Sequence, residues 1–323
     1  MIKFPDSSEK LTKEGILNLY KPLGITSFKT VQRARHLLKA KKAGHLGTLD
    51  PMAEGVLPIA LNGSTRIIQF LSGLTKEYLV ELRLGIETDT QDATGTVISQ
   101  KSIDHITDKD IEDAANDYIG EIEQIPPMYS AKKQNGVPLY KLARKGIEVA
   151  RKPNKIIIYS LEIHERINDR IKFRVRCSSG AYMRTLCYDI GNKLDCGGHM
   201  TQLIRQEVGI FKSKNTITLE KLECLEDMEK VSNYIISNDQ ILSFLPELRV
   251  KTEYLDQVLN GSPLTKSVIE TVPEKLTSGT NFRILDSAGF PAAIVESLFD
   301  KERYELTDRQ EKVFKFKRVL TTN

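Results

Sequence analysis

A strict two-residue alternation at residues 170–177 is the feature that most limits how this chain can fold. Four apolar side chains alternate there with cationic ones, in the sequence Arg-Ile-Lys-Phe-Arg-Val-Arg-Cys. Because successive side chains of a strand point to opposite faces, one face of this strand is expected to pack on a core while the other carries positive charge outside. The segment therefore predicts a sheet with one buried and one solvent-facing side.

Further periodic segments surround this strand. Their mixture of strands and helices indicates an α/β (α+β) domain with a central mixed or largely antiparallel sheet, rather than a strict βαβ series. The predicted strands are residues 15–20, 78–84 and 155–166, and the predicted helices are residues 108–118, 139–145 and 182–194.

A further helix is expected after the turn Lys21-Pro22-Leu23-Gly24. Thr26 or Ser27 can cap its first turn, since either hydroxyl can accept a backbone N–H. The side chains near helical spacing are Phe28, Val31, Ala34 and Leu38, which leaves Lys29, Arg33 and Arg35 toward another face.

The length of 323 residues predicts two domains, at about 100 to 200 residues per domain. A plausible boundary lies at Leu245-Pro246, and short strands are expected beyond it at 282–286, 292–296 and 312–320. We therefore expect an N-terminal extension over residues 1–14, a large domain over 15–245 and a small β-rich domain over 246–323.

Charge is distributed unevenly along the chain. The formal net charge of +4 is by itself weak evidence for a polyanionic partner. Residues 21–49, however, contain seven Lys or Arg and no acid, and residues 131–155 contain eight with Glu148 as the only acid. Such blocks suit phosphate contacts, although a basic face that is merely solvated has the same composition.

The cysteine pattern and the apolar runs exclude several classes. None of the four cysteines forms a C-x-x-C pair, and the ligand-like spacing of Cys196 and His199 has no matching second pair, so no metal site is predicted. The N-terminus has no apolar signal-like segment, and no run of 18 apolar residues occurs. A cytoplasmic protein without membrane association is expected.

The segment at residues 44–58, Gly-His-Leu-Gly-Thr-Leu-Asp-Pro-Met-Ala-Glu-Gly-Val-Leu-Pro, is the most unusual in the chain. Its three glycines and two prolines indicate a loop that is either a connector or a site, because glycine permits close backbone approach and proline fixes direction. Spacing alone favours a connector, with Asp50 as a turn or capping residue.

This segment resembles the signature loop of the TruB family, the tRNA pseudouridine-55 synthases. The resemblance covers roughly residues 15–209, in the family's order. The other matching segments are Lys21-Pro22, Lys76-Glu77-Tyr78, residues 85–92 (GIETDTQD), 125–131 (IPPMYSA), 177–185 (CSSGAYMRT) and 197–200 (GGHM).

The resemblance implies a fold and an activity. The large domain would be a catalytic domain with the pseudouridine synthase fold, and residues 246–323 would form a PUA-like RNA-binding domain. The implied reaction isomerises uridine 55 in the T loop of tRNA, after the base has flipped into a cleft. No outside donor takes part, so no cofactor is expected, and the chain lacks both GxxxxGK[ST] and GxGxxG. The T arm of tRNA is the implied partner, with no obligatory protein partner and a monomeric enzyme.

Three catalytic roles transfer from the family. Asp50 resembles the essential aspartate, which acts at the ribose C1′ side by direct attack or by assisting glycal formation. Arg184 resembles its arginine partner, which would lower the aspartate pKa by roughly 1 to 3 units. Tyr78 resembles the tyrosine that stacks on the target base. Without the resemblance, Arg184 would be read as a surface arginine and Tyr78 as a core or edge aromatic.

Six further residues are implied to bind the substrate. His45 would occupy the gap left by the flipped uridine, and Lys21 would support the loop or meet a phosphate. Tyr182 and Leu203 match positions that line the pocket, where plain core packing is the alternative. Lys132 and Lys133 are assigned to the tRNA backbone.

Two other functions remain open from the sequence. A noncatalytic RNA-binding protein or tRNA chaperone would use the same basic blocks without needing Asp50 or Arg184. A guide-RNA-dependent pseudouridine synthase would share the catalytic residues but would need partner subunits.

Overall fold

The structure is a computed structural model that describes residues 14–320 apart from residues 131, 135, 226 and 227. The predicted N-terminal extension therefore lies outside the described residues, except for residue 14. No helix within the described part of the chain is both long and apolar enough to cross a bilayer.

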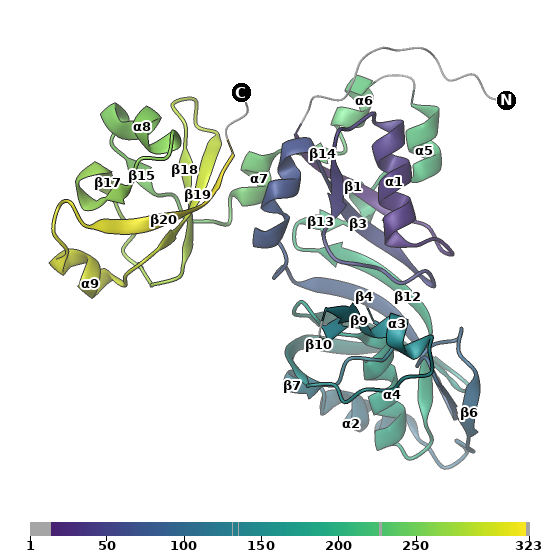
Figure 1. Cartoon of the computed structure of the whole chain (residues 1–323). Helices are drawn as coiled ribbons and strands as arrows, with labels where there is room; N and C mark the ends of the chain where they lie inside the picture. Colours follow the sequence, from purple (N-terminus) through teal and green to yellow (C-terminus); the bar gives the residue numbers. More distant parts are fainter. Residues whose placement is uncertain (1–13, 131, 135, 226–227, 321–323) are drawn as a thin grey trace.

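A ten-stranded sheet forms the body of the molecule (Figure 1). Only the β12–β3 pair is parallel, and the other pairs are antiparallel, which confirms the predicted mixed and largely antiparallel sheet. Its main path runs β14 (Ile235–Ile236), β1 (Gly15–Lys21), β3 (Ala53–Leu61), β12 (Gly198–Val208), β4 (Lys76–Leu84), β11 (Arg170–Cys177), β10 (Asn154–Ile167) and β7 (Gly120–Gln124), while β2 (Ala43–His45) pairs with β3 and β13 (Phe211–Lys212) with β12.

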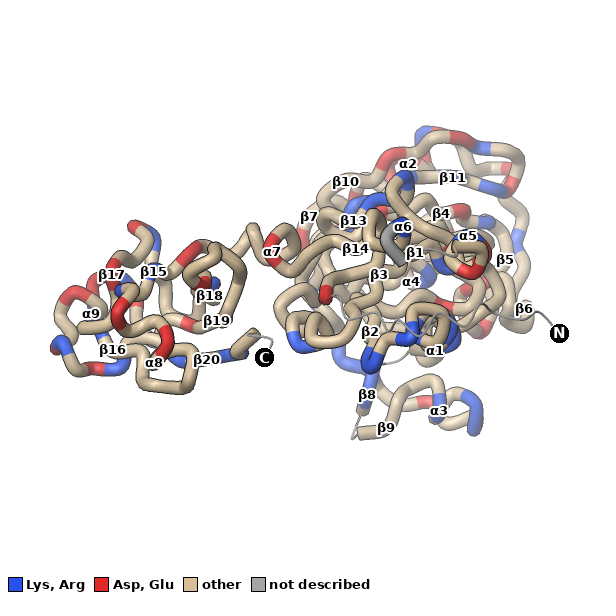
Figure 2. The backbone as a smooth tube through the Cα atoms, turned by 90° about the horizontal axis from the view of Figure 1, so that it is seen from above, with Lys and Arg blue, Asp and Glu red and all other residues tan. Residues whose placement is uncertain are grey.

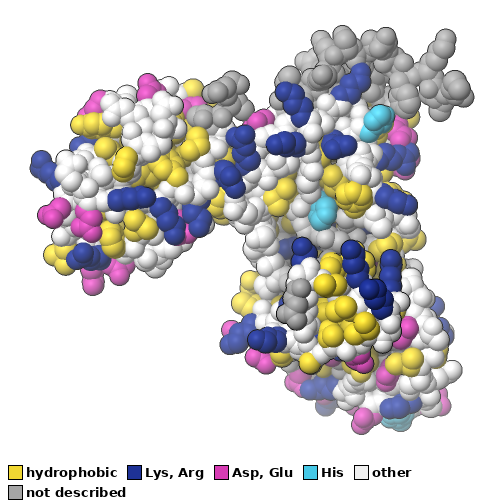
Figure 3. All heavy atoms as spheres, in the orientation of Figure 1, with side chains coloured by type: hydrophobic (Ala, Val, Ile, Leu, Met, Phe, Trp, Pro, Cys, Tyr) yellow, Lys and Arg dark blue, Asp and Glu magenta, His cyan; other side chains and the backbone are white. Residues whose placement is uncertain are grey.

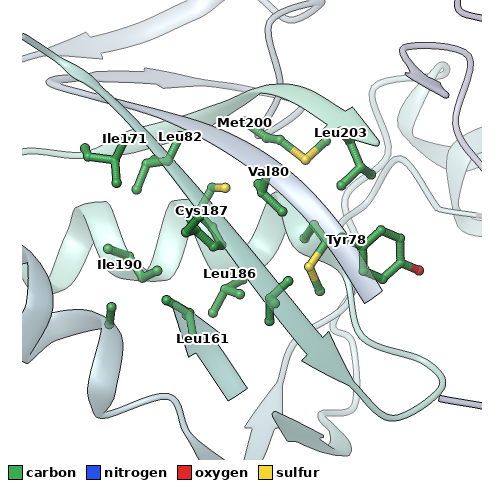
Figure 4. Close-up of a cluster of buried hydrophobic side chains, with 14 of the residues drawn as sticks. Tyr78, Val80, Leu82, Leu161, Ile171, Leu186, Cys187, Ile190, Met200 and Leu203 are labelled. Carbon is green, nitrogen blue, oxygen red and sulfur yellow. The ribbon is translucent and has the colours of Figure 1, made fainter. Parts of the chain in front are cut away.

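Helices cover the sheet in two places. At the β4–β11–β10 part, α4 (Met183–Lys193) and α2 (Asp108–Asn116) pack over one hydrophobic core, and at the β1–β3 part, α1 (Ser27–Leu37) and α5 (Leu219–Cys224) pack over a second. Figure 4 shows the first core, in which side chains of β4 and β12 meet those of α4. The remaining elements of this part are η1 (Asn62–Phe70), β5 (Ile86–Thr88), β6 (Val97–Gln100), β8 (Lys133–Gln134), β9 (Val137–Pro138), α3 (Leu139–Ala143), η2 (Ser213–Asn215), α6 (Met228–Ser232) and α7 (Asn238–Leu242).

Strand β11 has the predicted alternation. Its four apolar side chains are buried, since Ile171, Phe173, Val175 and Cys177 are each at most 2% exposed. Its cationic side chains face outward, as expected, but acids of the neighbouring strands neutralise several of them. Arg170 pairs with Glu81 at 2.5 Å, Arg174 with Glu77 at 2.7 Å, and Lys172 with Glu165 at 2.9 Å.

Helix α1 begins where the sequence predicted. The Thr26 side chain accepts a hydrogen bond from the backbone N–H of Lys29, which caps the helix. The expected place of Phe28 beside Val31 and Ala34 is wrong, because Phe28 is 65% exposed. The buried stripe instead includes Ser27 and Thr30, so its first turn faces the sheet with small polar residues.

The expected loop over residues 44–58 is only partly a loop. Strand β3 begins at Ala53 and is buried along nearly its whole length, so the second half of the segment is a central strand. Gly55 lies opposite Arg205 of β12 with φ at +109°, and a Cβ there would come within 2.3 Å of the Arg205 carbonyl oxygen. Glycine thus allows two backbones to approach closely here rather than ending an element.

The C-terminal residues form a separate four-stranded sheet, and its predicted strands are confirmed. The order is β16 (Leu264–Thr265), β20 (Lys312–Val319), β19 (Pro291–Ser297) and β18 (Asn281–Leu285). It has its own hydrophobic core and lies to one side of the large sheet, joined through α7 (Figure 1). The other elements here are β15 (Arg249–Val250), η3 (Thr252–Tyr254), α8 (Leu255–Leu259), η4 (Lys266–Val268), β17 (Ile269–Thr271) and α9 (Lys301–Leu306).

Candidate active site

A cavity of about 270 Å³ lies where β4 and β12 meet the loop before β3 and the start of α4. Five of the nine residues predicted for the site line it, namely Asp50, Tyr78, Tyr182, Arg184 and Leu203. The other four, His45, Lys21, Lys132 and Lys133, lie outside its lining.

The loop that carries Asp50 is held in place by backbone contacts. The Ser27 hydroxyl both accepts from the Leu49 N–H and donates to the Leu49 carbonyl, each at 2.8 Å. The Gly24 N–H donates to the Pro51 carbonyl at 2.8 Å. The β1–α1 connection therefore fixes the backbone on either side of Asp50.

Arg184 forms the predicted pair with Asp50. Its guanidinium is nearly buried, and Nη2 lies 2.9 Å from Asp50 Oδ2. Nη2 also donates to the Tyr129 carbonyl at 2.7 Å. Because Arg184 sits in the first turn of α4, the helix and the residue 129 segment together set the direction of the carboxylate.

A second aspartate, Asp92, completes this group and was not predicted. Its Oδ2 lies 3.3 Å from Arg184 Nη1, and its Oδ1 accepts from Thr90 Oγ1 at 2.7 Å and from the Thr94 N–H at 2.9 Å. Asp92 is only 4% exposed. It stands in the matched segment 85–92, but nothing in its spacing indicated that it would reach Arg184.

The pKa of Asp50 is raised, contrary to the prediction for a carboxylate beside an arginine. Burial is the largest influence and raises this pKa, and the Asp92 carboxylate raises it as well. Arg184 lowers it, as expected, and so does Lys21, but desolvation outweighs them. The Asp50 side chain still has 37% of its surface exposed, so it remains open to a substrate.

Tyr78 lines the cavity from β4, and only 6% of it is exposed. Figure 4 shows its ring at one end of the buried cluster near Leu203, with the hydroxyl directed away from the cluster. Tyr78 is the cross-strand partner of Arg205, and the two side chains are hydrogen-bonded. Burial raises the pKa of Tyr78 to about 12, while Arg205 acts in the opposite direction.

Arg205 is a functional candidate that sequence reasoning missed. It is 1% exposed, and its guanidinium donates to three carbonyl oxygens: Val56 at 2.7 Å, Gly47 at 3.1 Å and Thr48 at 3.3 Å. It thereby ties the Asp50 loop to β12. The signal was available, since Arg205 follows the predicted pocket residue Leu203 by two positions and so shares its strand face.

Lys76 was missed in the same way. It lines the cavity two residues before Tyr78, on the same face of β4, and its Nζ donates to the Leu74 carbonyl at 2.7 Å. Burial, followed by repulsion from Arg205, lowers its pKa to about 8, while Cys177 raises it.

Tyr182 is fixed at the N-terminus of α4. The Gln124 side chain accepts from its N–H at 2.7 Å and donates to its carbonyl at 3.0 Å. Burial raises the pKa of Tyr182, and a hydrogen bond with Ser130 lowers it. Leu203 lines the cavity from β12, where it is paired across the strands with Val80.

Lys21 and His45 do not line the cavity. Lys21 is fully buried, and its Nζ donates to the carbonyls of Ala53 at 2.6 Å and Pro22 at 2.9 Å. Of its two predicted roles, this burial favours support of the loop. His45 is at the end of β2, half-buried, and burial lowers its pKa.

Several basic segments lie on the same side of the molecule, which we call the basic side. Figure 2 shows the Lys and Arg segments of α1, β8 and α3 on the same side of the backbone, and Figure 3 shows such side chains gathered near α3 beside the hollow in the middle of this face. Lys133 is exposed on β8, whereas Lys132 is half-buried and hydrogen-bonded to Asn154.

Cys196 and His199 make protein contacts rather than gathering with other ligand-type side chains. The Cys196 thiol donates to the Gly197 carbonyl at 3.2 Å, and His199 Nδ1 is hydrogen-bonded to the Ile86 carbonyl at 2.8 Å. Among residues 14–320 outside the gaps, no three or more His, Cys, Asp or Glu side chains lie together in a group that could hold a metal.

The cavity combines an oriented carboxylate, a buried arginine that holds it, and an aromatic and aliphatic slot between Tyr78 and Leu203. A carboxylate can attack or stabilise an electron-poor carbon, and the slot can stack a planar ring. The site is therefore suited to chemistry at a carbon that bears a flat heterocycle.

Two family models and the curated relatives all show similarity to pseudouridine synthases. Residues 35–183 match the model of the TruB family pseudouridylate synthase (N terminal domain), and residues 184–261 match the tRNA pseudouridylate synthase B C-terminal domain. A protein of Clostridium kluyveri named tRNA pseudouridine synthase B is 46% identical over 265 residues, which cover 81% of this chain and 90% of that protein. One of the same name from Dehalococcoides mccartyi is 42% identical, over 76% of this chain and 82% of its own length.

A solved structure is also similar. A chain in the crystal structure of a Cbf5–Nop10–Gar1 complex matches with a TM-score of 0.75 and 26% identity, over 95% of this chain and 85% of that chain.

Proposed function

This chain belongs to the TruB family of pseudouridylate synthases, and from this premise we propose that it converts uridine 55 in the T loop of tRNA to pseudouridine. The family and the relatives' names make it an isomerase that acts on tRNA uridine. The observation that carries the proposal that this cavity converts uridine to pseudouridine is the Asp50–Arg184 pair at 2.9 Å. This pair borders a slot large enough for one base.

In the proposed reaction, the bond between ribose C1′ and uracil N1 breaks, the base turns, and C5 bonds to C1′. C5 then loses its proton and N1 gains one, so the product is an isomer of the substrate. Asp50 acts at the ribose, by attacking C1′ or by assisting formation of a glycal. The carboxylate must be ionised for either route, and Arg184 favours that form while burial and Asp92 oppose it. Arg184 has a second function, since it fixes the carboxylate toward the cavity.

The target base must leave the RNA stack to reach Asp50. We propose that it stacks on Tyr78 opposite Leu203, a contact worth about 1 to 3 kcal/mol for aromatic stacking. His45 fills the space that the uridine leaves, and Tyr182 closes the slot from the α4 side. This binding energy offsets the few kcal/mol that base flipping costs.

The tRNA backbone contacts the basic side of the molecule. This proposal is supported by the exposed cations of α1 and by the exposed Lys133 of β8, because α1 and β8 lie on the same side of the molecule in Figure 2. Phosphate contacts of this kind give affinity without reading sequence, so the shape of the T arm would supply selectivity. We further propose that the enzyme is a monomer that needs no protein partner and modifies cytoplasmic tRNA.

The decisive experiment maps pseudouridine on an unmodified tRNA transcript after incubation with purified wild-type protein or with Asp50→Asn, with no cofactor or metal added. We expect product at the T-loop uridine with wild type alone. Asn keeps the size of the side chain but cannot supply the charge, so tRNA affinity should stay within a few fold while the product is lost. Full activity of Asp50→Asn would overturn the assigned role.

The alternatives predict other results. A noncatalytic RNA-binding protein would form no product, and its tRNA refolding activity would survive Asp50→Asn. A guide-dependent enzyme, which the similarity to a Cbf5-containing complex keeps as the second candidate, would form product only after guide RNA and partner subunits are added. Product from wild type on bare transcript excludes both.

A further inference from the structure

One end of the active-site cavity has two cations without a carboxylate partner, Lys76 and Arg205. Arg184, the other arginine at the cavity, is paired with both Asp50 and Asp92. By contrast, Lys76 and Arg205 form no ion pair with any carboxylate in the described part of the chain. The Arg205 charge acts to lower the pKa of His45 and of Lys76, and the Lys76 charge acts to lower the pKa of Cys177.

Burying a charge without a counter-ion is costly. The carbonyls of Gly47, Thr48 and Val56 satisfy hydrogen bonds of Arg205 but do not cancel its charge. Lys76 donates to one acceptor, the Leu74 carbonyl, and an ammonium has three protons to give. This end of the cavity is therefore suited to stabilise a negative charge on a bound ligand.

Both cations lie beside the slot for the base. Lys76 and Tyr78 share one face of β4, and Arg205 is the cross-strand partner of Tyr78. Gly47 lies between them, since a Cβ built there would be 3.6 Å from both Lys76 Cε and Arg205 Nη1. The positive charge is thus next to the aromatic ring that lines the cavity.

We propose that Lys76 contacts the uracil ring in this cavity and, with Arg205 behind it, stabilises the negative charge that the base acquires when its bond to C1′ breaks. The inference rests on the proposed function and adds a catalytic residue to it. The electron pair of the C1′–N1 bond goes to N1 and is shared with O2 and O4 of the ring. Lys76 keeps its protons, and Arg205 acts as a positioning residue through Tyr78 and the Asp50 loop.

A fixed cation of this kind is an efficient catalyst because it needs no rearrangement when the charge forms. The lowered pKa of Lys76, about 8, still leaves its amine mostly protonated at neutral pH. Arg205 and Cys177, from the two neighbouring strands, are the groups that influence it.

A backbone phosphate is the competing source of negative charge. Lys76 is half-buried inside the cavity, two residues from the buried Tyr78, whereas a lysine such as Lys133 is exposed on the surface. The location of Lys76 therefore favours the base over a phosphate.

The test compares Lys76→Met with wild type in single-turnover reactions, with enzyme in excess over tRNA. One tRNA has uridine at the target position and the other has 5-fluorouridine there, whose fluorine itself stabilises the departing base. The loss of the original nucleoside is measured by digesting the tRNA and analysing it by mass spectrometry. We expect Lys76→Met to slow the reaction of uridine about 100-fold, to slow that of 5-fluorouridine by clearly less, and to leave the tRNA Kd within about threefold.

Controls separate charge from structure. Lys172→Met, on the outer face of β11, should react like wild type, and Lys76→Arg, which keeps the charge, should be faster than Lys76→Met. If Lys76→Met does not fold, Lys76→Gln offers a polar replacement of similar length. Equal losses on the two tRNAs, or a weaker Kd with an unchanged rate, would overturn the inference. If wild type forms no pseudouridine, the proposed function itself fails, which is a distinct outcome.

Discussion

Asp50 is held between charges of opposite sign. Arg184 at 2.9 Å favours its ionised form, while burial and Asp92 favour the protonated form, and the net effect raises its pKa. Activity that needs the Asp50 carboxylate is lost as the pH falls through this pKa. Wild type should therefore lose its rate at a higher pH than an enzyme with an ordinary aspartate would.

Asp92→Asn tests this balance. Removing the Asp92 charge lowers the pKa of Asp50. In a plot of the single-turnover rate against pH, the acid limb, where the rate falls, should therefore move to lower pH. The maximal rate should still fall by about 10- to 100-fold, because Arg184 loses the partner that orients it. Asp89→Asn, at an exposed position of the same turn, serves as the control. A limb that moves to higher pH would contradict the assigned electrostatics.

The parallel seam between β3 and β12 is the element that joins the Asp50 loop to the base slot. At Gly55 the two backbones approach so closely that a side chain does not fit, and φ is positive. Gly55→Ala should lower the free energy of unfolding by about 2 to 4 kcal/mol, as measured by denaturant unfolding, and should reduce activity because Arg205 moves. Gly73→Ala, where a Cβ would contact nothing within 4 Å, should change neither. Equal effects of the two substitutions would refute this account of the seam.

Helix α4, which carries Arg184, also contains an unfavourable charge. Burial raises the pKa of Asp189 from 3.8 to about 6. The folded protein thus holds this proton more readily than the unfolded chain, so the contribution of Asp189 to stability falls as pH rises from about 4 to about 6 and stays low above that.

Asp189→Asn should accordingly raise the free energy of unfolding at pH 7 by about 1 to 3 kcal/mol and leave it unchanged near pH 4. Urea unfolding at the two pH values measures the difference. Tyr118, whose pKa is raised by burial and by the nearby Asp189, provides a control. Tyr118→Phe retains Asp189, so it should change the free energy of unfolding by the same amount at both pH values. A destabilising effect of Asp189→Asn at pH 7 would show that the carboxylate has a favourable role.

At the scale of the whole molecule, the two faces of the sheet domain differ in how their cations are used. Three cations on the outer face of β11, Arg170, Lys172 and Arg174, are paired with acids, whereas Lys133 is exposed on β8, which lies on the basic side shown in Figure 2. Lys133→Ala should weaken tRNA binding equally for different tRNAs and reduce the salt dependence of log Kd by a slope of about 1. Lys172→Ala, whose ammonium is paired with Glu165, should leave both unchanged. Binding measured across a salt series distinguishes the two.

Local periodicity was sufficient for much of the fold. The alternation at residues 170–177, the cap at Thr26 and the short C-terminal strands all correspond to elements of the structure, because strand and helix periods depend on neighbouring residues. Strand β3 was missed because glycine and proline are breakers in most contexts, and only the close approach of β12 makes Gly55 suitable for a strand.

The amino-acid sequence by itself determined much of the strand and helix pattern, the basic blocks and, through the resemblance, the candidates Asp50, Arg184 and Tyr78. Tertiary structure alone decided that Asp92 reaches Arg184, that Lys21 is buried behind the loop, and that Lys76 and Arg205 share one end of the cavity. The reason is physical: these contacts join residues that are far apart in the chain, and desolvation, which sets the direction of the Asp50 pKa, depends on everything packed around the group.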